Sequence, residues 1–183
     1  MKGIIFNLLE EVVTRHYGED AWDDLLDGAA LSGSYTSLGS YPDDEALRLI
    51  SMGAESFNST PFEMLRWFGR EAMPLLAVRY PDYFRAHTTT RPFVLSVNSI
   101  IHPEVRMFYP GADVPTFGFR DEPDGSLVMV YNSARRFCAL AVGFMEGAAS
   151  YYGETVSVDQ IQCMHRGEPV CECRVTFHGK SRV

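Results

Sequence analysis

The sequence predicts an α+β fold, in which a helical N-terminal subdomain packs on a C-terminal subdomain with a four-stranded antiparallel sheet. Up to about Tyr109, apolar residues recur every three or four positions, which is typical of amphipathic helices. Beyond Tyr109, two apolar runs flank a Pro-Asp-Gly turn and two later runs alternate apolar and polar residues, and both patterns are typical of strands. With 183 residues we expect one domain, divided into a helical part over about 1–60 and a part with the sheet over about 61–183.

Three helices are predicted in the first 60 residues. The first carries apolar residues at helical spacing from Ile4 to Val13, and Gly18 is its expected end. The stretch "AWDDLL" predicts a short second helix. The third, "DDEALRLISMGAESF", is expected to begin near Asp43 or Asp44.

Two further helical segments follow. Thr60 and Glu63 form a capping box with Pro61 at the first helical position, and Pro74 is expected to kink or end this helix. The apolar stretch "RPFVLSVNSIIHPEVRMFY" predicts a buried helix that is interrupted by Pro103.

The second half predicts strand, strand, helix, strand, strand. "FGFRDEPDGSLVMVYN" indicates a hairpin around a Pro-Asp-Gly turn. "SARRFCALAVGFMEGAASYYG" predicts a helix with Ser133 as its N-cap. "TVSVDQIQCM" and "VCECRVTF" predict two strands joined by a turn at "HRGEP".

Charge and hydropathy exclude several classes of partner. The net charge of −8 argues against nucleic acid and against an anionic membrane surface. The sequence contains no window of eighteen uncharged apolar residues, so no membrane-spanning helix is expected. Glu10 and Glu11 interrupt the first apolar run, so it is not a signal peptide, and a cytoplasmic protein is expected.

No pattern of catalytic residues is present. The sequence has no phosphate-binding glycine-rich loop, no His-Glu-x-x-His and no Gly-x-Ser-x-Gly. We therefore expect a binding protein and not an enzyme.

His102 and the stretch "YNSARRF" suggest a ligand. Of the five histidines, His102 has the most apolar sequence neighbours. It is therefore either an ordinary core histidine or an axial ligand of haem iron. Tyr131, Ser133 and Arg135 alternate, so they are either a solvated strand end or three donors that clamp carboxylates. A histidine ligand and a clamp for two propionates suit haem b, which is held non-covalently because Cys-x-x-Cys-His is absent.

The sequence resembles bacterial stand-alone H-NOX (haem–nitric oxide/oxygen binding) domains, the family that includes the haem domain of soluble guanylate cyclase. The matching segments span essentially the whole chain: "MKGIIFN", "HYGEDAW", His102 with "EVRMFYPGADVPTF", and Tyr-x-Ser-x-Arg at Tyr131, Ser133 and Arg135. The resemblance implies that His102 is the proximal iron ligand and that the trio holds the propionates.

The resemblance also assigns Pro115 as the proline that presses on the porphyrin. Pro103 is a departure from the family, because a proline directly after His102 disfavours helical geometry there. We expect a kink or a helix start at this point, with an effect on the strain of the iron–histidine bond.

The resemblance bears on which gas is bound. Relatives that bind oxygen carry a distal tyrosine five residues past the arginine, and here that residue is Leu140. The other residues expected around the haem are also apolar: Ile5, Leu9, Met73, Leu76 and Phe144. A pocket without a donor favours nitric oxide and carbon monoxide over oxygen. Signalling is expected to pass to a separate histidine kinase or diguanylate cyclase, because the sequence contains neither.

The cysteines suggest a second site. Cys171 and Cys173 share one face of a predicted strand, and Cys138 lies on the helix expected to cover that strand. Together with Cys163 they offer four thiols, which could form a zinc site. The simpler interpretation is that all four are buried free thiols. Some H-NOX proteins hold zinc with three cysteines and a histidine here. Gln160 replaces that histidine, so zinc requires Cys173 or His165 instead.

Three alternatives stay open beside the nitric oxide sensor. They are a cysteine or zinc redox sensor of the same fold, a small-ligand domain of the vinyl-reductase type, and a haem enzyme such as a peroxidase.

Overall fold

The structure is a computed structural model and describes residues 1–179. Its N-terminal helices are α1 (Gly3–Tyr17), α2 (Glu19–Ala29), α3 (Asp43–Ser56) and α4 (Pro61–Arg79). The first helix ends at Gly18, whose φ of 93° is accessible chiefly to glycine. Both hydrogen bonds of the predicted capping box between Thr60 and Glu63 are present. No helix among the described residues is long and apolar enough to cross a membrane.

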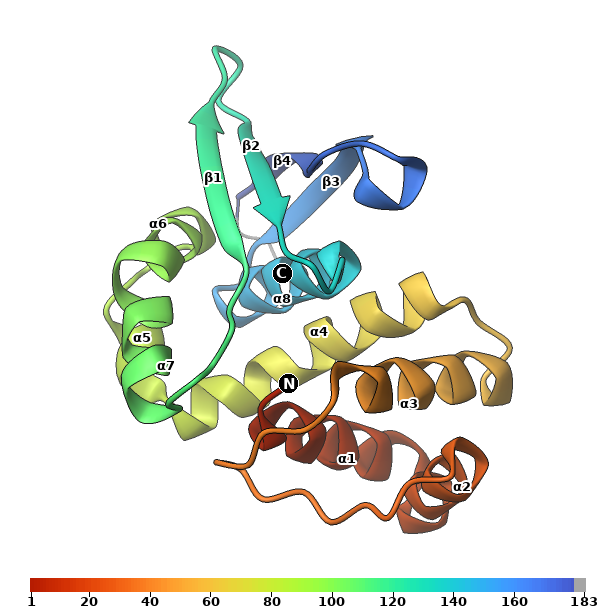
Figure 1. Ribbon diagram of the computed structural model, residues 1–183. Helices are drawn as coiled ribbons and strands as arrows, with labels where there is room; N and C mark the ends of the chain where they lie inside the picture. The colour runs from red at the N-terminus through yellow and green to blue at the C-terminus, as the bar shows by residue number, and fades with distance from the viewer. Residues whose placement is uncertain (180–183) are drawn as a thin grey trace.

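Pro74 does not end α4, which continues to Arg79. Met73, Leu75 and Ala77 around it are buried, so tertiary packing of this turn compensates for the lost backbone hydrogen bond. Helix α4 therefore runs along both halves of the molecule, below α8 and beside α1 and α3 (Figure 1).

The segment around His102 is less buried than predicted. It forms α6 (Thr90–Ser96), the π-helical turn η1 (Val97–Ile101) and α7 (His102–Phe108), after the short α5 (Pro81–Arg85). No residue of η1 or α7 is buried, so the prediction of a buried helix is wrong for this part.

The interruption predicted at Pro103 is present only as the π-helical turn before it, and the expected loss of helical geometry at His102 is wrong, because His102 has helical dihedral angles (φ −65°, ψ −38°). Helix α7 begins at His102, whose N–H bonds the carbonyl of Val97, five residues back. Pro103 has no N–H to offer the carbonyl of Ser99, which accounts for the wider turn before it.

The four predicted strands form one antiparallel sheet in the order β1-β2-β4-β3. Their bounds are β1 (Thr116–Asp121), β2 (Leu127–Asn132), β3 (Thr155–Gln162) and β4 (Cys171–His178). Helix α8 (Cys138–Tyr151) lies between this sheet and α4 (Figure 1). Ser133 is not its N-cap, because α8 begins only after a turn in which Ser133 Oγ accepts from the N–H of Arg135 at 3.3 Å.

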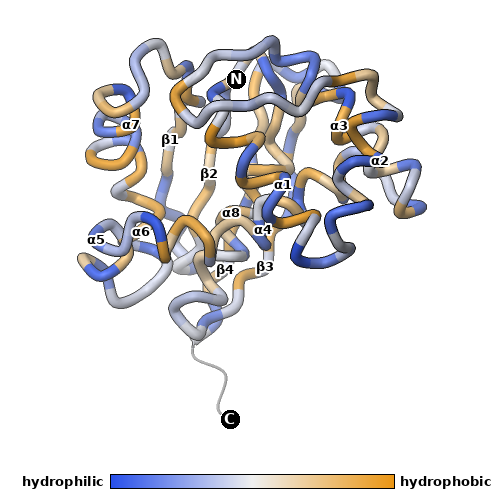
Figure 2. Tube along the Cα trace, turned by 90° about the horizontal axis from the view of Figure 1, so that it is seen from below, coloured by the Kyte–Doolittle hydropathy of each residue, from blue (hydrophilic) through white to orange (hydrophobic). Residues whose placement is uncertain are grey.

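The molecule has two apolar clusters. One joins α1 to α4 with the start of α8, and the other joins the sheet, α8 and the end of α4. Leu76 and Phe144 contact both clusters. Viewed from below, apolar residues gather along α4 and α8 inside the molecule and also along α7 at its outer edge (Figure 2).

The backbones of helices α4 and α8 lie very close together where the two halves of the molecule meet. A Cβ at Gly143 of α8 would lie 2.0 Å from the carbonyl oxygen of Arg66 in α4. The Arg66 guanidinium also pairs with Glu146 of α8. The backbones can approach so closely only because Gly143 has no side chain.

We expect Gly143→Ala to lower the free energy of unfolding by about 1–3 kcal/mol or more, because the helices must separate to admit the methyl group. Urea denaturation followed by circular dichroism measures this. Gly28→Ala is the matched control, since its Cβ meets only the flexible end of Met52. An unchanged stability of Gly143→Ala would show that the helices are not in such close contact.

Candidate functional site

His102 opens α7 and faces β1. Its ring lies 5.7 Å from that of Phe117, centroid to centroid. Its Nδ1 atom is buried and has no hydrogen-bond partner among the described residues. Burial, and then the charge of Arg106, lower the pKa of His102 to about 4, so the imidazole is neutral at pH 7. Neutral imidazole is the form that binds iron.

Tyr131 and Ser133 lie close together but not as one extended row. Strand β2 ends at Asn132, so only Tyr131 belongs to it and the predicted alternation stops there. Tyr131 is buried, and its hydroxyl accepts from the N–H of Phe137 at 2.9 Å. The turn thus brings the two hydroxyls to the entrance of α8.

Arg135 binds carboxylates in this structure. Its Nε atom lies 2.9 Å from Asp43 Oδ2, and its Nη1 lies 3.1 Å from Asp113 Oδ2. Nη1 also donates to the backbone carbonyl of Asp113 at 2.6 Å. The guanidinium, 13% exposed, therefore joins α3, the loop before β1 and the turn after β2. The prediction that Arg135 binds propionates stays a prediction, and in this structure its carboxylate partners are two aspartates of the chain.

Asp43 and Asp113 were not predicted as site residues. Burial alone would raise the pKa of Asp43, but hydrogen bonds from the Met1 ammonium and Arg135 hold it below its ordinary value. The carboxylate is therefore charged at neutral pH. Nothing in the local sequence around either aspartate pairs it with a distant arginine.

An apolar cavity lies between α1, α3, α4 and the start of α8. Its lining residues carry no hydrogen-bond donor in their side chains: Met1, Ile5, Phe6, Leu9, Ala46, Ile50, Leu65, Phe68, Phe137 and Leu140. The structure thus brings together three of the predicted residues, Ile5, Leu9 and Leu140. An oxygen ligand bound here would find no donor among these side chains.

The remaining predicted residues lie elsewhere. Leu76 and Phe144 lie between the two apolar clusters, whereas Met73 belongs to the cluster under the sheet. Pro115 precedes β1, and its carbonyl lies close enough to His102 to oppose the fall in the pKa of that imidazole.

These residues fit a haem. His102 offers a buried, unpaired ring nitrogen, and Arg135 already engages two carboxylates. The hydroxyls of Tyr131 and Ser133 are further donors beside it. The apolar cavity supplies side chains of the kind that pack against an apolar macrocycle.

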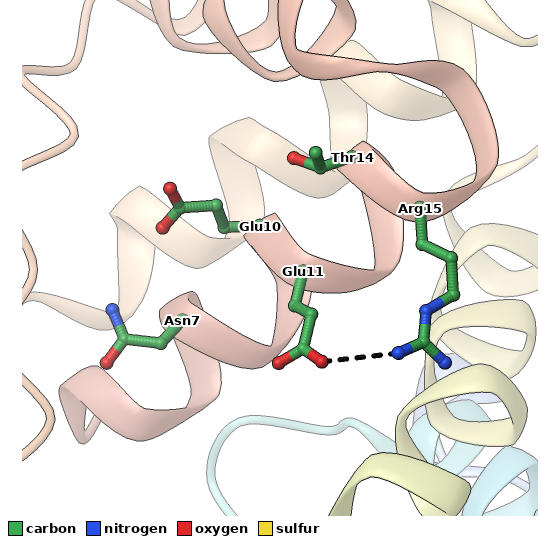
Figure 3. Close-up of a pocket in the computed structure, with 5 residues that line it drawn as sticks. All are labelled: Asn7, Glu10, Glu11, Thr14 and Arg15. Atoms are coloured by element: carbon green, nitrogen blue, oxygen red, sulfur yellow. Dashed lines mark hydrogen bonds and ion pairs between the residues drawn. The ribbon is translucent and has the colours of Figure 1, made fainter.

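A groove on the outer face of α1 has a different character. It is open and polar, and its lining comes from α1 alone: Asn7, Glu10, Glu11, Thr14 and Arg15 (Figure 3). Glu11 and Arg15 pair with each other at 3.4 Å. These charged, solvated side chains do not suit an apolar macrocycle.

Three of the four cysteines converge. The thiols of Cys138, Cys163 and Cys171 lie within 4.8 Å of one another, with Cys163 Sγ 3.9 Å from Cys138 and 3.8 Å from Cys171. Cys173 is buried but lies outside this group, so the predicted convergence of four thiols is wrong. Successive residues on one strand face are about 7 Å apart, which explains the separation of Cys173 from Cys171.

Within residues 1–179, no fourth zinc ligand joins the three thiols. The side-chain amide of Gln160 donates to the carbonyl of Gln162 at 2.8 Å. The Nε2 atom of His165 lies 2.7 Å from the carbonyl of Arg136. Burial raises the pKa of the Cys138 and Cys171 thiols.

We expect protein purified without chelator to carry far less than one zinc per chain. We also expect all four thiols to be titrated colorimetrically when the protein is denatured under nitrogen. Metal analysis by mass spectrometry is the direct measurement. Stoichiometric zinc that disappears in Cys163→Ser, but not in Cys173→Ser, would contradict this expectation.

Comparison with known proteins gives consistent matches. A family model described as "Haem-NO-binding" matches residues 2–160. An H-NOX protein from S. oneidensis in the Fe(II)NO state is 28% identical, with a TM-score of 0.91 over 98% of this chain and 100% of that one. The H-NOX domain SO2144 from Shewanella oneidensis in the Fe(II)CO state is also 28% identical, with a TM-score of 0.88 over the same shares.

A third match extends the similarity in fold. The unliganded Fe(II) H-NOX protein from K. algicida is 23% identical, with a TM-score of 0.86 over the full length of both chains.

Proposed function

The chain belongs to the haem–NO-binding family of H-NOX gas-sensor domains, and from this premise we propose that it is a nitric oxide sensor. In this proposal haem b is held non-covalently between the two halves, with His102 as the only protein ligand of a five-coordinate ferrous iron. The haem supplies an iron with one open position for a gas. Tyr131, Ser133 and Arg135 bind its propionates, Pro115 packs on the macrocycle, and the chain senses without catalysing a reaction.

The observation that carries the proposal is the placement of His102. A buried imidazole nitrogen without a partner, as His102 Nδ1 is here, is costly because an unsatisfied polar atom loses its hydrogen bonds to water. Iron coordination removes this cost by giving the ring a ligand bond. Arg135 nearby supplies positive charge for the carboxylates that accompany the iron.

The preference for nitric oxide follows from the apolar cavity. Bound oxygen gains most from a hydrogen-bond donor, and the lining side chains have none. Nitric oxide and carbon monoxide need no donor. The relatives from Shewanella oneidensis were solved with these two gases, which supports the same ligands here.

Signalling in this proposal depends on α7. Nitric oxide bound at the iron would weaken or break its bond to His102, and α7 would then be free to shift against α4 and the sheet. A separate protein reads this shift, and by the resemblance it is a histidine kinase or a diguanylate cyclase. The division near residue 60 and a cytoplasmic location belong to the same proposal.

The test is one set of absorption spectra of protein expressed with a haem precursor. We expect a strong Soret band that shifts with nitric oxide and with carbon monoxide, and no stable oxygen complex in air. A stable ferrous–oxygen spectrum would overturn the choice of gas. A protein that stays colourless with haem supplied would favour a thiol-based redox sensor, for which the three-thiol cluster is the supporting observation, or a domain of the vinyl-reductase type.

A further inference from the structure

Helix α7, which carries His102, has little packing of its own. None of its residues is buried, and Met107 and Phe108 near its end are 77% and 62% exposed. The π-helical turn before it has no buried residue either. A helix with so little apolar burial is expected to be among the less stable parts of a fold.

Two tyrosine hydroxyls fix this helix, one at each end. In the first turn of α7, Glu104 accepts a hydrogen bond from the Tyr83 hydroxyl of α5. Just after the last turn, the hydroxyl of Tyr109 lies 2.6 Å from that of Tyr80, which follows α4. All four groups are partly buried, so water competes weakly for them.

The other ends of these hydrogen bonds belong to a well-anchored part of the fold. Tyr80 follows Arg79, and Arg79 pairs with Glu11 of α1. In Figure 1, α5 and α7 lie side by side at the edge of the molecule, next to the end of α4. The Tyr80–Tyr109 hydrogen bond thus connects the histidine helix to the end of α4, the helix that runs along both halves, and the Tyr83–Glu104 hydrogen bond connects it to α5. Burial, and then Glu104, raise the pKa of Tyr83 to about 12, so its hydroxyl stays a donor at neutral pH.

We propose that Tyr80 and Tyr83 are positioning residues for His102, whose hydroxyls hold both ends of α7 and so oppose the departure of the histidine from the iron. This inference rests on the proposed function. The two hydrogen bonds would limit the response to nitric oxide, because both must break before α7 can move.

The experiment compares Tyr80→Phe, Tyr83→Phe and the double variant with wild type. Amide hydrogen exchange over 97–109 in the unliganded protein reports how firmly α7 is held. We expect exchange to be faster by about fivefold for each hydroxyl removed, the factor that corresponds to one ordinary hydrogen bond. Electron paramagnetic resonance of the nitric oxide adduct reports whether His102 stays bound, and we expect a larger five-coordinate fraction in the variants.

Matched controls separate positioning from general stability. Tyr35→Phe removes a hydrogen bond of the same kind, from Tyr35 to Glu45 at 2.8 Å, and should change neither measurement over α7. Glu104→Gln keeps an acceptor for Tyr83 and should lie closer to wild type than Glu104→Ala does.

Each outcome decides a specific claim. Exchange over 97–109 that is no faster than in Tyr35→Phe would overturn the holding of α7. Faster exchange with an unchanged coordination of the adduct would overturn the positioning of His102. A wild-type protein that takes up no haem would overturn the proposed function and the positioning role with it, while the exchange measurement would still decide whether the tyrosines hold α7.

Discussion

His102→Ala is expected to abolish the haem spectrum of protein purified without added imidazole. The variant removes the only iron ligand that we propose, so haem affinity should fall by at least the roughly tenfold to hundredfold that changes around metal ligands cause. The apolar cavity and Arg135 would remain to bind the porphyrin weakly. Absorption spectra and haem content per chain measure the effect.

Two further measurements make this result specific. Imidazole supplied in solution should restore the haem, since the smaller alanine leaves room where the ring was. His87→Ala is the control, because His87 lies edge-on to Phe93 away from α7. Wild-type haem content in His102→Ala without imidazole would contradict the assignment of His102 as the ligand.

The fold could be predicted largely because its signals are local. The capping box at Thr60 and the glycine after α1 act within a few residues, and both are present. The strands β3 and β4 show their alternation in the sequence itself, and β1 and β2 are indicated there by two apolar runs around a Pro-Asp-Gly turn. The burial of α7 could not be predicted in this way, since its apolar residues resemble those of a core helix and only the three-dimensional packing leaves them exposed.

The candidate site shows the same limit. His102, Tyr131 and Arg135 were singled out from residue type and from the family resemblance, and their roles at a haem stay predictions. The carboxylates Asp43 and Asp113 could not, because an ion pair between distant segments leaves no periodic pattern. Tyr83 was missed for this reason too. Its partner Glu104 comes near it only when α5 and α7 lie side by side.

We expect one hydroxyl placed in the apolar cavity to reverse the proposed choice of gas. Leu140 lies on α8, is 9% exposed and lines the cavity with Ile5 and Phe68. Leu140→Tyr would place a donor among side chains that have none. A hydrogen bond in a dry site contributes about 1–3 kcal/mol, so the ferrous protein should hold oxygen roughly tenfold to a hundredfold longer.

Leu140→Phe is the control that isolates the hydroxyl, because both aromatic residues overfill the site to a similar degree. Overpacking of this kind typically costs about 1–3 kcal/mol of stability, and it should affect the two variants equally. Stopped-flow absorption after mixing the ferrous proteins with oxygen gives the dissociation rates. A stable oxygen complex in the tyrosine variant alone would place the gas on the Leu140 side of the haem. Equal oxygen dissociation from both variants would mean that the gas binds elsewhere, since a donor beside the ligand cannot leave its lifetime unchanged.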